Sequence, residues 1–229
     1  MTSYERVFKT FKHQKVDKVP MYHIGFSSKI ASLLLGHEAY IGGGVQQWRE
    51  ANALWEGEEV HKEFLQRSFQ DALEIAEILD MDIVRLTYWR LPIKPTKKID
   101  EYTFLYGDKN NWHIRKFNPI TETFEVIEQY PPKEEISIED IEDDLEEKEK
   151  EIEKYNPTSK DFSDILIALK LLKEKRAIRV NAGGLQIPLD KVWLEAIYLR
   201  PDLVEKYLNI QVERAIKDIT YLSTTGVKF

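Results

Sequence analysis

Apolar side chains recur every three or four positions along most of this chain, which is the spacing of an amphipathic helix. The segment Thr2-Ser3-Tyr4-Glu5 opens the first helix, because a hydroxyl followed three residues later by a carboxylate forms a capping box. Pro201 suits the first turn of another helix. The spacing predicts further helices over residues 30–35, 45–55, 60–79, 162–172, 191–198 and 203–223.

Short apolar runs between these helices predict strands. Val19–Gly25 is predicted as the first strand, Asp82–Leu86 as the second and Ala177–Asn181 as the third. The last residues, Gly226–Phe229, resemble the start of a fourth strand. Strands that alternate with helices in this order are typical of an α/β fold with a parallel sheet.

The middle of the chain follows a different pattern. Between residues 102 and 127, apolar and polar residues alternate between turn sequences such as Gly107-Asp108 and Asn118-Pro119, which predicts a small antiparallel meander. An acidic helical stretch follows the meander. We therefore expect a single domain over residues 1–229, with an insert at 99–155 that combines the meander and the acidic helix.

Most of the negative charge lies in that acidic stretch. Residues 134–153 hold twelve acidic side chains and two lysines, whereas the net charge of the whole chain is −7, so the rest of the chain is mildly basic. This balance argues against a large nucleic-acid interface and is compatible with a local anion-binding pocket. Ile138, Ile141, Leu145 and Ile152 share one side of the predicted helix, whose other side is expected to face solvent.

Composition excludes several classes of protein. The chain contains no cysteine, which rules out disulfides, thiolate nucleophiles and thiolate-bound zinc within it. No apolar run approaches the roughly 20 residues of a membrane helix, and we expect a soluble, cytoplasmic protein. His37, His61 and His113 show no metal-ligand spacing, so no metal site is predicted.

Two segments carry a family resemblance. The first is TSYERVFKTFKHQKVDKVPMY at the start of the chain, where a helix of the type S-x-x-E-R-V precedes Asp17-Lys18-Val19-Pro20. The second is IRVNAGGLQIPLDKVWLEAIYLRPDLVEKYLN, with a strand, a Gly-rich turn, a Pro-led helix and a P-[DE]-L-V helix start. On these motifs the chain resembles the N-terminal part of the uroporphyrinogen decarboxylase superfamily. The insert at 102–132 also has a counterpart in members other than the true decarboxylases.

The resemblance implies a TIM (β/α)8 barrel. Outside the insert, however, the chain is too short for eight βα units, which need roughly 240 residues at about 30 residues each. We therefore expect a barrel truncated after about three βα units. Such a barrel leaves strand edges unpaired, which favours self-association into a homo-oligomer.

The superfamily includes two chemistries, which are cofactor-free decarboxylation of uroporphyrinogen and zinc-dependent methyl transfer from a corrinoid to a thiol. Decarboxylases carry the motif R-Q-A-G-R-Y after the first strand, where this chain has His23-Ile24-Gly25-Phe26-Ser27-Ser28. The family's aspartate after the second strand falls near Arg85-Leu86-Thr87, and its tyrosine after the third-strand turn falls near Trp193-Leu194. These departures favour the methyltransferase-like branch, whose zinc motif would lie beyond the end of this chain.

The expected function is therefore that of a corrinoid-dependent methyltransferase-like enzyme, represented here without its zinc-bearing half and inactive on its own. The resemblance implies no cofactor within this chain, and zinc and a corrinoid for the full-length enzyme. The implied partners are a small-molecule, tetrapyrrole or corrinoid ligand and a corrinoid protein, without nucleic acid or membrane. Two alternatives stay open, which are a decarboxylase of uroporphyrinogen or a related tetrapyrrole and a non-catalytic ligand-binding protein.

Site residues in a TIM-type barrel lie at the carboxyl ends of the strands. His23 and Arg85 are the predicted catalytic residues, although a lone histidine there also fits a structural role. A charge that points into a barrel must be paired or bind an anion. This favours Arg85 as a site residue, unless its side chain points outward between helices. The predicted substrate-binding residues are Phe26, Ser27, Tyr88, Trp89, Arg90, Asn181, Gly183, Gly184 and Gln186.

Overall fold

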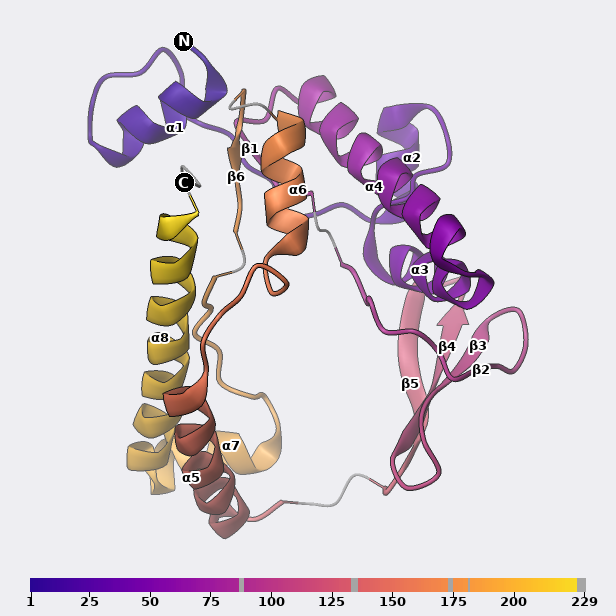
Figure 1. Ribbon diagram of the computed structural model, residues 1–229, viewed down its shortest axis with the longest axis vertical. Coiled ribbons are helices and arrows are strands. Elements are labelled where there is room, and N and C mark those ends of the chain that lie inside the picture. Colours follow the sequence, from indigo (N-terminus) through magenta and orange to yellow (C-terminus); the bar gives the residue numbers. More distant parts are fainter. Residues whose placement is uncertain (87–88, 133–135, 173–174, 181, 226–229) are drawn as a thin grey trace. The chain divides into compact units, whose positions relative to one another are not determined.

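The computed structural model describes residues 1–86, 89–132, 136–172, 175–180 and 182–225. The chain divides into two compact units. The first unit comprises Met1–Lys133 and Ile167–Arg179, and the second comprises Glu134–Leu166 and Val180–Phe229. The fold is mixed α/β, with a parallel strand pair and a four-stranded antiparallel sheet (Figure 1). The described residues form no closed barrel.

The N-terminal helices follow the predicted pattern. Helix α1 (Ser3–Phe11) has the predicted capping box, in which the Thr2 hydroxyl accepts a hydrogen bond from the Glu5 amide and the Glu5 carboxylate accepts one from the Thr2 amide. The next three helices are α2 (Ser28–Leu35), α3 (Gly43–Glu56) and α4 (Glu58–Ile78). The hydrophobic spacing therefore located all four helices.

The prediction of a first strand at Val19–Gly25 is wrong, because this segment has no regular secondary structure. It nevertheless lies beside the second predicted strand, since the Met21 carbonyl accepts hydrogen bonds from the Asp82 and Ile83 amides at 2.8 and 3.3 Å. The Met21 amide donates to the Asp82 carboxylate at 2.8 Å instead of to a strand carbonyl. Pro20 lacks an amide hydrogen, so backbone pairing cannot extend in that direction.

The parallel pair consists of β1 (Ile83–Val84) and β6 (Ala177–Ile178), with Val84 opposite Ile178. Both strands are shorter than predicted. Val84 is buried in a core formed with α2 and α4, and Ile178 packs against the same core. Asn181 and the predicted fourth strand at Gly226–Phe229 lie outside the described residues.

The predicted meander is confirmed as an antiparallel sheet in the order β2-β3-β4-β5. Its strands are β2 (Lys97–Lys98), which the sequence pattern did not indicate, β3 (Thr103–Gly107), β4 (Trp112–Asn118) and β5 (Thr123–Tyr130). The sheet packs on α3 in the first unit, as Figure 1 shows. The buried residues of this contact are Val45, Ala51, Phe104, Tyr106, Phe117 and Phe124.

The second unit contains the acidic helix α5 (Ile138–Lys154) with α7 (Lys191–Leu199) and α8 (Pro201–Thr224). Ile141, Leu145 and Ile152 are buried, which confirms the predicted apolar side of α5. The division of the chain into units falls within α6 (Ser163–Leu172). None of the described helices combines the length and apolar character that crossing a bilayer requires.

The predicted insert at 99–155 is divided between the two units. Its meander belongs to the first unit, where it packs on α3, whereas its helix α5 packs with α7 and α8 in the second unit. The two halves of the insert therefore bury their apolar residues against different partners.

Candidate functional site

Two arginines directly follow the two parallel strands. Arg85 follows β1 and Arg179 follows β6, and the Arg179 amide donates to the Val84 carbonyl at 2.9 Å. Side chains alternate between the two faces of a strand, and Val84 and Ile178 face the helix-covered core. The alternation therefore directs the arginine side chains to the face opposite this core.

Both arginines reach the irregular segment that precedes α2. Arg85 Nη1 donates to the Ile24 carbonyl at 3.4 Å, and Arg179 Nη1 donates to the Tyr22 hydroxyl at 3.1 Å. The Arg85 guanidinium also lies 5.6 Å from the centre of the exposed Trp89 ring, within cation–π range. No acidic side chain in the part of the chain that the structure describes forms an ion pair with Arg179.

His23 lies between Tyr22 and Ile24, the two residues that the arginines contact. Its Nδ1 accepts a hydrogen bond from the Gly25 amide at 3.2 Å, and its exposed ring stacks on Phe26 with 4.2 Å between ring centres. A neutral imidazole that accepts at Nδ1 carries its proton on Nε2. The histidine can thus offer an Nε2 proton to a ligand bound near the carboxyl ends of β1 and β6.

Phe26 and Ser27 also have structural roles. Phe26 is half-buried against the main core of the first unit. The Ser27 hydroxyl accepts a hydrogen bond from the Ile30 amide at 3.3 Å and caps the N-terminus of α2. Tyr88 lies outside the described residues.

Arg90 is held in a buried ion pair. Its Nε and Nη2 donate to Glu50 Oε1 at 2.9 and 2.5 Å, and Glu50 is fully buried. The same carboxylate accepts from the Leu91 amide at 2.8 Å and lies 3.1 Å from His61 Nε2. A buried carboxylate needs such partners to offset the cost of its desolvation. Arg90 therefore anchors the chain after β1 to α3.

The predicted residues after the third strand belong to the second unit. Gly183 and Gly184 line a cavity of about 300 Å³ between the residues that precede α6 and helix α8. A Cβ at Gly183 would lie 2.2 Å from the Ala215 Cβ, so this position needs glycine to pack against α8. The Gln186 backbone amide donates to Gln211 Oε1 at 2.9 Å, and the Gln186 carbonyl accepts from Gln211 Nε2 at 3.0 Å. Asn181 lies outside the described residues.

A buried carboxylate lines the same small cavity. Asp218 on α8 accepts a hydrogen bond from the Tyr155 hydroxyl at 2.8 Å. Burial, together with the hydrogen bond to Asp218, raises the pKa of Tyr155 above its ordinary value. The Arg214 guanidinium lies 4.7 Å from the centre of the Tyr155 ring. Cationic, acidic and hydroxyl groups thus surround the glycine turn.

Comparison with protein-family models, with curated proteins and with solved structures found no match to this chain.

The structure groups the predicted residues into two sets. One set lies near the carboxyl ends of β1 and β6 in the first unit and comprises His23, Phe26, Arg85 and Trp89. The other set is the glycine turn, which lines a cavity of the second unit. Sequence reasoning missed Arg179, although the pattern that selected Arg85, a charge within an apolar strand, recurs in Ala177-Ile178-Arg179-Val180. It also missed Asp218 and Glu50, because helical acidic residues carry no local sign of burial.

Metal-ligand residues do not gather in the part of the chain that the structure describes, where no three His, Asp or Glu side chains are placed to share an ion. The expectation that this chain binds no metal stays a prediction.

Proposed function

We propose that this chain belongs to the uroporphyrinogen decarboxylase superfamily of TIM-barrel enzymes, in its methyltransferase-like branch, and that the carboxyl ends of β1 and β6 bind an acidic small molecule. The observation that carries the proposal is the adjacency of Arg85 and Arg179 after two paired parallel strands. In α/β folds of this kind, ligands bind at the carboxyl ends of the strands.

The chemistry of the two side chains supports an acidic ligand. A guanidinium group holds a carboxylate through two parallel, charge-assisted hydrogen bonds. Arg179 has a neutral hydroxyl partner at 3.1 Å, which a ligand carboxylate can supplement or replace. The exposed Trp89 ring beside Arg85 offers a flat apolar surface for the body of the ligand.

In the methyltransferase-like branch, this chain would bind and orient the ligand, and His23 would hold a proton at Nε2 beside it. The zinc, the corrinoid and the corrinoid protein belong to the proposal through the family resemblance alone. Zinc coordination would supply the activated thiolate when the metal is bound.

One observation favours the alternative of a tetrapyrrole decarboxylase. The sequence lacks R-Q-A-G-R-Y after the first predicted strand, and that absence argues against carboxylate binding. Arg85 and Arg179 nevertheless supply two guanidinium groups near the carboxyl ends of the strands, from positions outside that motif. A non-catalytic ligand-binding protein would use the same two groups without a chemical step.

Absorbance titration with the octacarboxylate uroporphyrin tests the proposed site. We expect Arg85→Gln and Arg179→Gln each to weaken binding about tenfold, because each removes a charge-assisted contact. Lys12→Gln, which changes an exposed charge on another part of the first unit, should leave binding unchanged. Equal affinity of the unaltered protein and the three variants for uroporphyrin would contradict an acidic-ligand site at the carboxyl ends of β1 and β6.

An activity assay distinguishes the methyltransferase-like branch from the decarboxylase alternative. We expect no conversion of uroporphyrinogen to coproporphyrinogen by this chain, measured by chromatography against a blank without protein. Conversion above the blank that Arg179→Gln abolishes would replace the methyltransferase proposal with the decarboxylase alternative.

A further inference from the structure

The cavity of about 300 Å³ in the second unit is lined by three segments of the chain. Helix α8 supplies Gln211, Arg214 and Asp218, whose spacing of three and four residues places them on one face of the helix. The turn at Gly183 and Gly184 forms a second wall. The third wall comes from the chain between α5 and α6 and consists of Tyr155, Asp161 and Phe162. The volume is at the lower limit of small-molecule sites, roughly 300–1,000 Å³, and therefore suits a compact ligand.

Both other walls are tied to α8. A Cβ on Gly183 would lie 2.2 Å from a side-chain carbon of that helix, so the glycine turn packs directly on it. The Tyr155 hydroxyl donates to Asp218 Oδ1 at 2.8 Å, and the Phe162 ring stacks on Tyr221 of α8 with 5.7 Å between ring centres. These contacts form the cavity before a ligand binds.

Hydrogen-bond donors are available on two sides of the cavity. Arg214 forms no hydrogen bond or ion pair with another residue in the described part of the chain, and its guanidinium lies 4.7 Å from the centre of the Tyr155 ring. A guanidinium group carries five N–H donors in a fixed planar arrangement. Among the residues that the structure describes, the backbone amides of Gly183 and Gly184 likewise have no hydrogen-bond acceptor.

Two carboxylates provide acceptors. Asp218 is buried, and within the described segments its one hydrogen-bond partner is the Tyr155 hydroxyl at Oδ1, which leaves Oδ2 for a ligand. Asp161 Oδ2 accepts from the Thr158 amide and hydroxyl at 2.7 and 2.8 Å, so its Oδ1 is also available. The hydrogen bonds from Thr158, above all that of its amide, hold the pKa of Asp161 below its usual range. Asp161 is therefore ionised at neutral pH.

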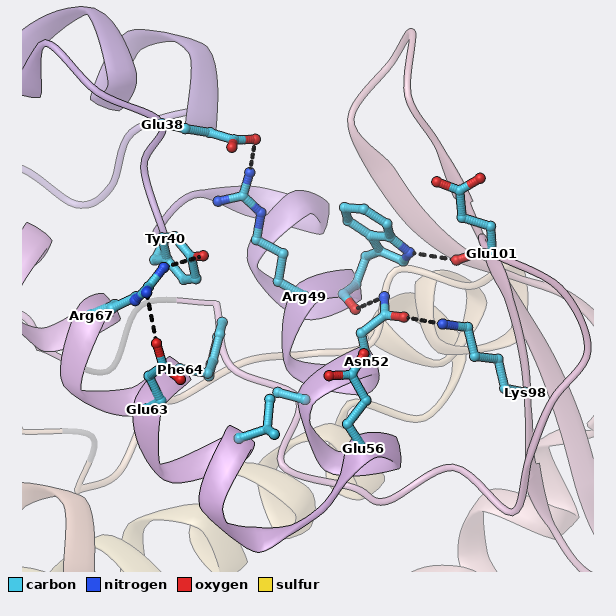
Figure 2. A pocket seen from close by; sticks show the side chains of 13 residues that line it. Glu38, Tyr40, Arg49, Asn52, Glu56, Glu63, Phe64, Arg67, Lys98 and Glu101 are labelled. Carbon is cyan, nitrogen blue, oxygen red and sulfur yellow. Dashed lines mark hydrogen bonds and ion pairs between the residues drawn. The ribbon is translucent and has the colours of Figure 1, made fainter.

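The larger cavity of the first unit, of about 490 Å³ between α3, α4 and β2, differs in this respect (Figure 2). Its basic side chains already have partners. Arg49 is paired with Glu38. Arg67 is paired with Glu63 at 2.6 Å, and Lys98 Nζ donates to a side-chain oxygen at 2.6 Å. A ligand there would compete with these partners, so the smaller cavity is the stronger candidate for a binding site.

The available groups favour a neutral ligand with several hydroxyls. The cavity of the second unit holds one guanidinium and two carboxylates, so an anionic ligand would meet an excess of negative charge. A simple cation would leave the donors of Arg214 and of the glycine turn unused. A hydroxyl group both donates and accepts hydrogen bonds. Several hydroxyls on one small ring can therefore bind the carboxylates and the donors together.

We propose that this cavity binds a neutral monosaccharide. Hydroxyls of the sugar donate to Asp218 Oδ2 and Asp161 Oδ1, and they accept from Arg214 and from the amides of Gly183 and Gly184. The ligand differs in charge from the acidic molecule proposed for the carboxyl ends of β1 and β6, and its site belongs to the other unit.

Isothermal titration with three neutral hexoses, D-glucose, D-galactose and D-mannose, tests this assignment. We expect at least one of them to bind saturably with a Kd of about 1 mM, which is the affinity that four hydrogen bonds of ordinary net strength provide. Absence of saturable binding by all three hexoses would overturn the proposal.

Charged analogues of the sugar that binds test the predicted neutrality. The corresponding uronic acid should bind about tenfold more weakly, because Asp161 and Asp218 repel its carboxylate. A uronic acid that binds as tightly as the hexose would overturn the proposal. Tenfold tighter binding of the corresponding amino sugar would assign a cationic ligand instead and overturn it as well.

Matched variants locate the binding. Arg214→Gln and Asp218→Asn should each weaken hexose binding about tenfold, since each removes a charge-assisted hydrogen bond. Arg214 is exposed, so its variant keeps the test decisive even where Asp218→Asn disturbs folding. The controls Glu213→Gln and Lys160→Gln change exposed charges that do not line the cavity. Circular dichroism confirms that each variant is folded.

The variants also separate this site from the proposed function. Arg179→Gln, in the first unit, should bind the hexose as the unaltered protein does, so a failed uroporphyrin titration leaves this test valid. Hexose binding that neither Arg214→Gln nor Asp218→Asn weakens would place the sugar elsewhere and overturn the proposal.

Discussion

Asp82 is fully buried and joins three segments of the first unit. Its carboxylate accepts hydrogen bonds from the Arg6 guanidinium of α1 and from the Met21 amide, and its backbone precedes β1. Arg6 also binds Asp17 at 2.6 and 2.9 Å, and that contact holds the pKa of Asp17 well below its usual range. This network takes the place of the predicted first strand.

We expect Asp82→Asn to lower the free energy of unfolding by about 1.5–3 kcal/mol, because it removes one of the two carboxylates that bind the buried Arg6 guanidinium. Urea unfolding followed by circular dichroism measures the change. Asp80→Asn is the matched control, since Asp80 pairs with Lys18 at the surface and is 72% exposed. A loss of stability no larger than that of the control would contradict this role for Asp82.

His37 gives the first unit a pH-dependent contact. Its Nε2 lies 3.1 Å from the buried Asp71 carboxylate, and this hydrogen bond raises the pKa of His37 above its ordinary value. The folded state then binds the proton more tightly than the unfolded state does. The stabilisation is complete below the unfolded pKa of about 6.5 and is lost as pH rises through the folded value.

We therefore expect His37→Asn, which cannot ionise, to destabilise the protein more at about pH 5.5 than at about pH 8.5. Urea midpoints of the two proteins at both pH values measure the difference. Burial lowers the pKa of His113, which gives an opposite pH dependence, but His113 is present in both proteins and cancels in the comparison. A difference independent of pH would contradict the prediction.

At the scale of elements, the contact between α3 and the meander depends on Gly44. A Cβ on Gly44 would lie 2.5 Å from the Glu122 carbonyl oxygen and 2.5 Å from the Phe124 amide nitrogen. Both atoms belong to backbone at the start of β5, so neither can rotate away. The residues around this contact are the aromatic and aliphatic core that joins the sheet to the helix.

We expect Gly44→Ala to lower the free energy of unfolding by about 1–3 kcal/mol, through displacement of β5 from α3. The sign is diagnostic, because the same exchange in an unobstructed helix stabilises by about 0.8–1 kcal/mol. Gly184→Ala is the control, since a Cβ there meets no atom within 4 Å. Thermal unfolding of both variants measures the effect, and an increase in stability of Gly44→Ala would contradict the close contact.

Helix α5 of the second unit shows why an amphipathic pattern predicts which side of a helix is buried. Leu145 of α5 is fully buried against Trp193, Ala196 and Leu203, while all acidic residues of the same helix except the half-buried Glu142 are exposed. Ser137 caps this helix with a capping box to Asp140. A single helix with one apolar side needs only one partner surface, so its own sequence specifies which side is buried.

At the scale of the whole molecule, several apolar side chains remain exposed. On α8, Val212, Ile216 and Ile219 follow helical spacing and are 38%, 59% and 50% exposed. An apolar stripe of this kind favours association with another surface. Self-association into a homo-oligomer therefore stays our prediction for this chain.

We expect light scattering to give a mass above the 27.0 kDa of one chain, and Ile216→Glu to shift the population toward the monomer, because it places a charge in the apolar stripe. Glu213→Gln, an exposed change on the same helix, is the control. A single monomeric species of the unaltered protein across the concentrations tested would contradict the prediction.

The sequence by itself determined the helices, the meander and the mixed α/β class, because hydrophobic spacing and capping residues act within one element. The capping box of α1 and the buried side of α5 are examples. Tertiary structure decided what depends on partners distant in the chain. Asp82 accepts a hydrogen bond from the Met21 amide where strand pairing was predicted. Glu50 forms an ion pair with Arg90, which was predicted to bind the substrate. Arg179 comes beside Arg85 only through pairing of β6 with β1, since the two lie 94 positions apart in the sequence.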